Sequence, residues 1–321
     1  MSRIVYMAVS GGGIAGGHKM IIRHVETLRE LGFDAACYTN PKNVVPSWFK
    51  HDAPFLIGGG LKSGDIIVVP DDETPALRDL VARRYPVVVF AQNPYYAASS
   101  GGLDAIAAYP PEKAPPVIAV APRLAATFRR AFPDNVVEIV PCFADERLFR
   151  PTADKAAEVA LVPRKRPVEA AAIQAFYRRL IPGRLQLDWR ELKGATEEQV
   201  AQAFARAGLF LSLSHLESVG MTPLEAMASG CLVAGFTGVG GEAYATPENG
   251  FWVPSEDCEA AADALARAAD IFLTGGPELA RRREAGFETA RQWSHARFRD
   301  ALEEVWMRLA PQARVRSAAS A

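Results

Sequence analysis

The amino-acid sequence predicts an α/β protein made of two doubly wound domains, each built on a parallel sheet. Short apolar runs alternate with stretches of helical spacing along the chain. Most of these runs lack period-two alternation, which is typical of strands that are buried on both faces. The length of 321 residues favours two domains over one. We expect the first domain at residues 1–150 and the second at 156–289, with the polar stretch 145–155 as a linker.

The first half of the chain contains the apolar runs of six strands. These strands are expected at 3–9, 34–39, 65–70, 86–91, 115–121 and 135–141. Between the first two, Met20, Ile21, Val25 and Leu28 recur at helical spacing, so a helix is expected over 18–32, ending at Gly32. Two similar patterns predict helices at 74–85 and 121–132.

The second half continues the alternation. Strands are expected at 158–163, 185–189, 209–214 and 231–236, helices at 167–180, 196–208 and 257–273, and an amphipathic stretch as far as 309. A short helix is expected to begin with Thr222 as its N-cap and Pro223 in its first turn. Glu225 would complete a capping box, and Gly230 would end the helix.

Composition excludes several classes of protein. A net charge of −1 argues against binding to nucleic acid through phosphate neutralisation. No run approaches the ~20 apolar residues that span a bilayer, and the first ten residues are too short and too lightly charged for a signal peptide. The four cysteines are widely spaced, which argues against disulfides and a zinc site, so a cytoplasmic location is expected.

A glycine-rich stretch, VSGGGIAGGHKM, follows the first strand. Its spacing Gly11-x-Gly13-x-x-Gly16 fits a dinucleotide-binding loop. Such a loop requires an acidic residue at the end of the second strand, roughly 20 residues further on. That strand ends in Thr39 and Asn40, without a carboxylate. An NAD(P)-dependent oxidoreductase is therefore a less favoured alternative.

The densest signal lies in residues 209–242, a strand, a loop, a short helix and a second strand. Ligands of such sheets bind beyond the carboxyl ends of the strands, and the free N–H groups of a helix start attract an anion, most plausibly a phosphate. Glu217 and Glu225 flank this helix start. Glu217 alone could be a solvated loop carboxylate, and Glu225 alone could be a capping residue. The two carboxylates together at one helix start favour a binding site.

The segment HLESVGMTPLEAMASGCLVAG resembles the donor-binding signature of the family 4 glycosyltransferases, also called glycosyl transferases group 1. The matching residues are Glu217, Gly220, Glu225, Ala226, Met227, Ala228 and Gly230. The resemblance implies the GT-B fold: two Rossmann-like domains that face a cleft, the first for the acceptor and the second for a nucleotide-sugar donor. It also implies that a C-terminal helix at about 290–309 packs back on the first domain.

The same resemblance implies a reaction. A retaining, hexosyltransferase-type enzyme would move a sugar from a UDP- or GDP-sugar to a saccharide or lipid-linked acceptor, in cell-surface polysaccharide or glycolipid synthesis. Neither a metal nor a cofactor is expected, because the protein supplies the cations that meet the diphosphate. Lys165 falls on the family's lysine position. Ala160 occupies the usual arginine position, so either Arg164 or Arg166 takes that role.

The implied site residues fall into three groups. The catalytic group is Glu217, Lys165 and Arg164; the donor-binding group is Glu225, Ser218, Val219, Gly220, Met221 and Thr222; the acceptor or cleft group is Gly16, Gly17, His18, Gln92 and Asn93. Glu217 would hold a hydroxyl of the donor sugar, and Glu225 would bond the nucleotide ribose. Asn93 has a second interpretation, as a residue that shapes the turn before Pro94.

Four features of the sequence leave alternatives open. The segment FAQNPYY lacks the histidine that many relatives present, and the stretch between Arg166 and Trp189 is short. A non-catalytic relative that serves as a sugar-binding or partner subunit therefore remains an alternative. The run Asp71 to Glu73 resembles an acidic metal motif, but a solvated turn is preferred, with Asp72 or Thr74 capping the next helix. The run Arg281 to Arg283 would contact anionic lipid at a membrane surface or form a solvated face.

Overall fold

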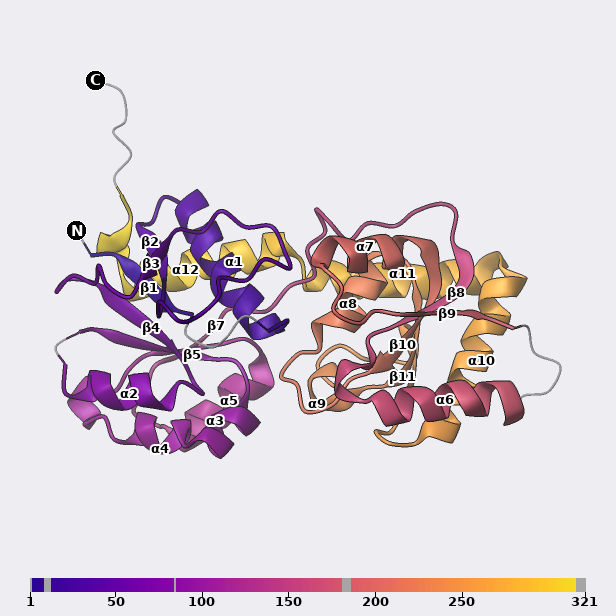
Figure 1. The fold of residues 1–321 in the computed structure, drawn as a ribbon, viewed down its shortest axis with the longest axis horizontal. Helices are drawn as coiled ribbons and strands as arrows, with labels where there is room; N and C mark the ends of the chain where they lie inside the picture. The colour runs from indigo at the N-terminus through magenta and orange to yellow at the C-terminus, as the bar shows by residue number, and fades with distance from the viewer. Residues whose placement is uncertain (1, 9–12, 84, 181–185, 316–321) are drawn as a thin grey trace, which may run out of the picture. The chain divides into compact units, whose positions relative to one another are not determined.

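The structure, a computed structural model, describes residues 2–8, 13–83, 85–180 and 186–315. The chain divides into two compact units: Met1–Cys142 with Phe298–Ala321, and Phe143–Arg297. Each unit is a parallel sheet with helices on both faces (Figure 1). The predicted α/β fold with two doubly wound sheets is therefore confirmed.

The first unit is built on a seven-stranded sheet in the order β3-β2-β1-β4-β5-β6-β7. Its strands are β1 Ile4–Met7, β2 Ala35–Thr39, β3 Phe55–Ile57, β4 Ile66–Pro70, β5 Val87–Ala91, β6 Val117–Ala119 and β7 Val137–Ile139. Its helices are α1 Gly16–Glu30, α2 Thr74–Val81, α3 Pro94–Ser100, α4 Gly102–Ala107, α5 Pro122–Ala131 and most of α12 His295–Leu309. Every strand pair in the sheet is parallel.

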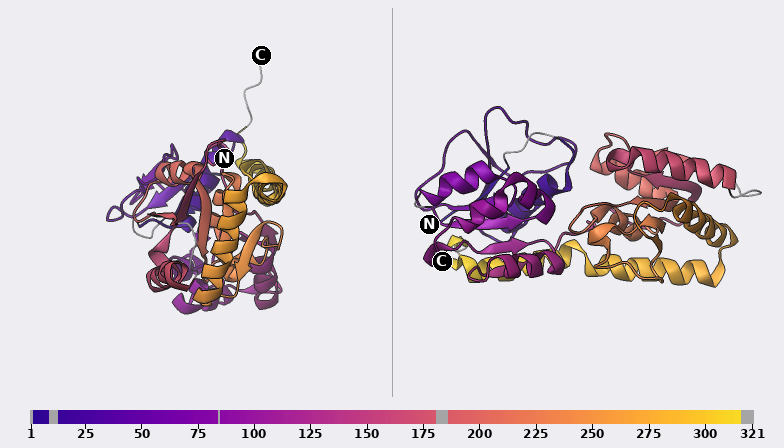
Figure 2. Two further views of the ribbon diagram at one scale, coloured as in Figure 1. Left: turned by 90° about the vertical axis from the view of Figure 1, so that its right-hand side faces the viewer. Right: turned by 90° about the horizontal axis from the view of Figure 1, so that it is seen from below.

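A buried hydrogen-bonded chain ties the C-terminal helix α12 to this sheet. Trp306 Nε1 donates to the Tyr6 hydroxyl at 3.3 Å, and Tyr6 Oη lies 2.9 Å from Nδ1 of His24 in α1. The Phe298 ring lies 4.9 Å from the His24 ring. Because these side chains are almost completely buried, they join three elements in one core. The yellow α12 can be followed along this unit in Figure 2.

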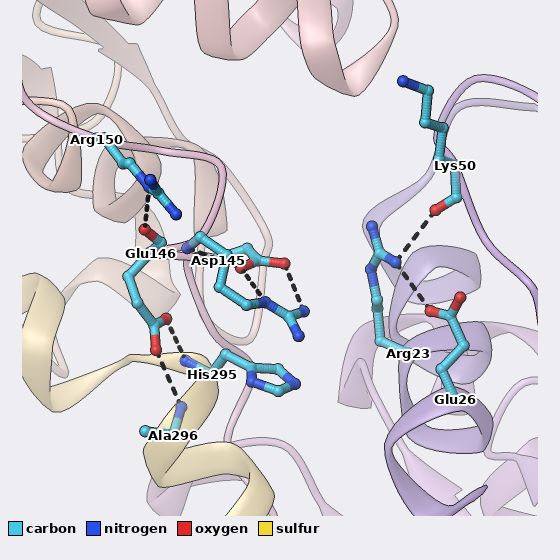
Figure 3. A network of polar contacts seen from close by, with 9 residues as sticks. Arg23, Glu26, Lys50, Asp145, Glu146, Arg150, His295 and Ala296 are labelled. Carbon is cyan, nitrogen blue, oxygen red and sulfur yellow. Dashed lines mark hydrogen bonds and ion pairs between the residues drawn. The ribbon is translucent and has the colours of Figure 1, made fainter. Parts of the chain in front are cut away.

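The loop between β2 and β3 is held on α1 by polar contacts. Arg23 Nη1 donates to the Glu26 carboxylate at 2.8 Å and to the Lys50 carbonyl at 3.1 Å (Figure 3). Glu26 also accepts from the Asp52 N–H at 2.8 Å. A long loop without regular structure is thereby fixed in one conformation.

The second unit is built on a five-stranded parallel sheet in the order β12-β11-β10-β8-β9. Its strands are β8 Ala156–Leu161, β9 Asp188–Glu191, β10 Ala207–Leu213, β11 Leu232–Phe236 and β12 Gly250–Val253. Its helices are α6 Pro167–Leu180, α7 Glu197–Arg206, α8 Met221–Ala228, α9 Gly238–Gly241, α10 Cys258–Thr274 and α11 Gly276–Gln292. In Figure 1, α7, α8 and α11 lie on one side of the sheet, and α6 and α10 on the other.

The first residues of the stretch predicted as a linker are packed, whereas residues 150–154 are exposed. Asp145 and Phe149 are both buried. The carboxylate of Glu146 accepts from the backbone N–H groups of His295 at 2.7 Å and Ala296 at 3.2 Å (Figure 3). A side chain of this stretch therefore supplies the acceptor that the first turn of α12 lacks within the helix.

The sequence missed several elements. Strands β3 and β12 and helices α3 and α4 are short, so their apolar patterns give little periodic signal. The amphipathic stretch toward residue 309 is two helices, α11 and α12, which are separated at Trp293. No helix in the described ranges is long and apolar enough to cross a membrane.

The buried imidazole of His24 predicts how stability changes with pH. Burial lowers the pKa of His24 from 6.5 to about 3. Between these values the unfolded chain binds a proton that the folded chain does not, so the free energy of unfolding falls as the pH falls below 6.5, by up to about 1.4 kcal/mol per pH unit.

Urea unfolding of the wild type and of His24→Leu between pH 4 and 8 tests this expectation. The variant should be less stable at pH 8, by about 1–3 kcal/mol, because the Tyr6 hydroxyl loses its acceptor. It should lose less stability than the wild type below pH 6.5. Parallel curves for the two proteins would show that His24 is not the titrating group.

Candidate donor and acceptor sites

The loop that follows β10 leads into α8 through a glycine. Helix α8 begins at Met221, and its N-cap is Gly220 at φ +70°, a conformation that favours glycine. A Cβ at Gly220 would lie 3.2–3.3 Å from polar atoms of Tyr244, Glu217 and Ser214. The prediction that Thr222 is the N-cap was therefore wrong, because the helix starts earlier and no side chain caps it.

Glu217 and Lys165 meet at the carboxyl edge of the second sheet. Lys165 ends a short 3₁₀ turn after β8, and Glu217 lies in the loop after β10, the strand beside β8. Lys165 Nζ lies 2.5 Å from Glu217 Oε1. Their side chains are 36% and 25% exposed, so both remain accessible to a ligand. The structure thus brings together two of the three predicted catalytic residues.

Glu225 lies inside α8 rather than in a capping box. The residue is buried, at 6% exposure. Because the N-cap is Gly220, which has no side chain, the reciprocal hydrogen bonds of a capping box cannot form, and the capping-box interpretation was wrong.

The other residues predicted to bind the donor are held by α9 and the segment after it. A Cβ on Gly240 would lie 2.5 Å from the Val219 nitrogen, so only glycine permits the close approach of these two backbone segments. The Tyr244 hydroxyl donates to the Gly220 carbonyl at 2.8 Å. Ser218 Oγ is buried and forms no hydrogen bond with any described part of the chain. The sequence reasoning missed Tyr244 and Gly240; the glycine-rich stretch TGVGGE was the available signal.

The two candidate diphosphate arginines have different surroundings. Arg164 is exposed. Arg166 is only 2% exposed, donates to Glu169 Oε1 at 2.8 Å, and lies 2.7 Å from Nδ1 of His215. His215 was not among the predicted site residues. Its partner Arg166 is buried within the second unit.

The predicted acceptor residues cluster in the first unit. Gln92 Nε2 donates to the Gly17 carbonyl at 3.0 Å, in the first turn of α1, where Gly16 and His18 also lie. A Cβ on Gly17 would lie 3.1 Å from the Gln92 amide. Asn93 is the N-cap of α3 and accepts from the N–H groups of the next turn, which supports its second interpretation. Gly11 of the glycine-rich stretch lies outside the described residues.

The acidic run after β4 is a turn, as the sequence suggested, and its Asp72 is exposed, but Asp71 is not solvated. Asp71 is buried, and burial raises its pKa to about 8. Its Oδ2 accepts from the Asn93 N–H at 3.2 Å. Helix α2 has no side-chain cap, and Thr74 Oγ1 donates instead to the Ser100 carbonyl at 2.9 Å. Within the described ranges, no group of three His, Cys, Asp or Glu side chains is arranged to hold a metal ion.

The basic run in α11 is largely paired. Arg281 and Arg282 form ion pairs with Glu278, and the Arg282 guanidinium lies 4.2 Å from the centre of the Phe251 ring. Arg283 lies over the Phe272 ring at 5.7 Å.

Comparisons with known proteins find similar sequences and structures. Residues 155–270 match the family described as "Glycosyl transferases group 1". The chain is 27% identical over 286 residues, 84% of each chain, to an alpha-1,6-glucosyltransferase of Actinobacillus pleuropneumoniae serotype 7.

Solved structures share the fold at low identity. A sucrose-phosphate synthase of Thermosynechococcus elongatus superposes with a TM-score of 0.73 at 17% identity, over 97% of this chain and 100% of that one. HepE of Anabaena, solved in complex with UDP, superposes with a TM-score of 0.72 at 15% identity, over 95% and 100%. The two parallel sheets and these superpositions show that the chain has the GT-B fold, and the match over residues 155–270 makes most of its second unit similar to the glycosyl transferases group 1.

Proposed function

We propose that the chain transfers a sugar from a nucleoside diphosphate sugar to a saccharide or lipid-linked acceptor with retention of configuration. The observation that carries the proposal is the Lys165–Glu217 pair beside the start of α8. UDP-glucose is the first donor to test, because HepE of Anabaena was solved with UDP-glucose and the curated relative is an alpha-1,6-glucosyltransferase. An α-glucoside made from α-linked UDP-glucose retains the configuration of the donor.

The proposed reaction requires a site that stabilises the negative charge of a leaving diphosphate. The bond between the sugar C1 and the phosphate oxygen breaks, its electron pair stays with UDP, and the acceptor oxygen bonds to C1 as its hydroxyl proton passes to the departing phosphate oxygen. Lys165 and Arg164 supply positive charge where that negative charge grows, and the N–H groups at the start of α8 add to it. The Lys165 ammonium has three N–H donors, so it can meet the phosphate while it stays paired with Glu217 Oε1, and the other carboxylate oxygen of Glu217 accepts from a sugar hydroxyl.

Glu225 and the Gly17–Gln92 pair complete the proposed roles. Glu225 accepts from the nucleotide ribose. Gln92 contacts the acceptor. The proposed reaction would serve the synthesis of a cell-surface polysaccharide or glycolipid. The protein's own cations meet the diphosphate, so we propose that transfer continues in the presence of EDTA.

Nucleotide-sugar binding is tested by thermal unfolding with UDP-glucose and GDP-glucose. A donor at a hundredfold its Kd stabilises the fold by about 2.7 kcal/mol, on the order of 5 °C in Tm. Release of UDP or GDP is then followed, and the product's anomeric proton is read by NMR. A folded chain that no nucleotide sugar stabilises contradicts the proposal and favours a partner subunit without catalysis. A β-linked product contradicts retention.

Glu217→Gln should lower kcat by about 100-fold or more, because the amide cannot accept the sugar hydroxyl as the carboxylate does. The variant has the same volume and a partly exposed side chain, so Tm should stay within about 2 °C of the wild type. Steady-state kinetics with UDP-glucose measure the loss. Full activity in this variant would show that Glu217 is not in the site.

Glu225→Gln should raise the Kd for UDP by about tenfold, because it weakens a charged hydrogen bond to the ribose. Isothermal titration with UDP measures the change, and titration with pyrophosphate, which has no ribose, is the control. Equal loss of affinity for both ligands would contradict the ribose contact.

Gly17→Ala should reduce acceptor-dependent transfer and leave the Kd for UDP unchanged, because the methyl group displaces the Gln92 amide. Stability should not fall, since alanine favours the helix by about 1 kcal/mol. Gly13→Ala is the matched control, because no described atom lies within 4 Å of its Cβ position. Equal transfer rates in the two variants would remove Gly17 from the acceptor site.

A further inference from the structure

The side chain of Arg166 joins several strand ends at the carboxyl edge of the second sheet. It donates to Glu169 in the first turn of α6 and to His215 after β10. Its guanidinium lies 5.0 Å from the centre of the Phe236 ring, at the end of β11. Glu256, before α10, lies 3.8 Å away. One buried cation thus contacts segments that follow β8, β10, β11 and β12.

The contact with Arg166 fixes the tautomer of His215. A guanidinium has only N–H donors and keeps its proton at all working pH values. Nδ1 of His215 must therefore accept the 2.7 Å hydrogen bond, and a neutral imidazole then carries its proton on Nε2. A protonated His215 would have no acceptor to offer.

The backbone of His215 in turn holds the loop that carries Glu217. The His215 carbonyl accepts from the Glu217 N–H at 3.0 Å and from the Val239 N–H at 3.1 Å. Lys165, the neighbour of Arg166 in sequence, bonds the Glu217 carboxylate itself. Two consecutive residues therefore act on Glu217, one at its carboxylate and one through His215 at its backbone.

We propose that Arg166 is a positioning residue: it fixes His215 as the Nε2–H tautomer and thereby sets the loop geometry of Glu217. Arg164, which is exposed, is the arginine that meets the donor diphosphate. The inference rests on the proposed function, because it assumes that Glu217 contacts the donor sugar. It assigns different roles to two arginines that the sequence could not distinguish.

A pair of variants at His215 tests the positioning role. His215→Asn keeps an oxygen acceptor near the position of Nδ1, whereas His215→Leu has similar bulk and no acceptor. The leucine variant should lose kcat about 10- to 100-fold with UDP affinity within about twofold of the wild type, as expected for a displaced catalytic group. The asparagine variant should recover most of kcat. Equal kcat in the two variants would overturn the proposal.

Variants of the two arginines separate positioning from phosphate binding. Arg166→Met should lower kcat and spare the Kd for UDP, whereas Arg164→Met should raise that Kd. Combining Arg166→Met with His215→Leu should lower kcat no further than either change alone, because both remove one interaction. A rise in the Kd for UDP in Arg166→Met that matches Arg164→Met would overturn the proposal. Arg190→Met, which removes a partner of Glu158 in the same sheet, is the control and should keep the wild-type kcat.

The tautomer of His215 gives a readout that does not depend on transfer. In ¹⁵N NMR of the imidazoles, wild-type His215 should show a protonated Nε2 and an unprotonated Nδ1, and Arg166→Met should lose this fixed pattern. If Arg166→Met does not fold, the two His215 variants decide the question. Absence of nucleotide-sugar binding by the wild type would contradict the proposed function. Normal donor binding with wild-type kcat in His215→Leu would contradict the positioning role alone.

Discussion

The ion pair between Lys165 and Glu217 connects residues 52 positions apart in the chain, and the candidate site depends on it. It forms because β8 and β10 are parallel neighbours, so the segments that follow them emerge at the same edge of the sheet. Neither residue would be near the other in an extended chain. The sheet topology is thus what converts two separate motifs into one charged site.

Glycine makes the close backbone approaches around this pair possible. Gly220 enters α8 in a left-handed conformation, and Gly240 brings α9 within contact distance of the loop after Glu217. A side chain at either position would move the loop or the helix start. The Tyr244 hydroxyl then fixes the Gly220 carbonyl. The loop between Glu217 and α8 is therefore held by these contacts in the chain itself, which suits the proposed role of stabilising developing charge without reorganisation.

Much of the architecture could be predicted because buried parallel strands have a strong local signature. The apolar runs around Val5, Val89 and Leu211 indicated their strands, and the Glu217 to Glu225 signature indicated a resemblance to the glycosyl transferases group 1. The helix start at Met221 could not be predicted, because Thr222-Pro223 is the better local cap and only the tertiary packing of Gly220 overrides it. The different surroundings of Arg164 and Arg166 could not be predicted either, since burial of one of two nearby arginines is decided by partners such as His215, distant in sequence.

A double-mutant cycle on kcat/KM for UDP-glucose tests most directly whether Lys165 and Glu217 act as one unit. The wild type, Lys165→Met, Glu217→Gln and the double variant are compared under the same conditions. The ion pair predicts that the double variant is about as active as the worse single variant, a coupling of ~1 kcal/mol or more. If the two losses multiply, or if neither change affects kcat/KM, the site is not organised by this pair.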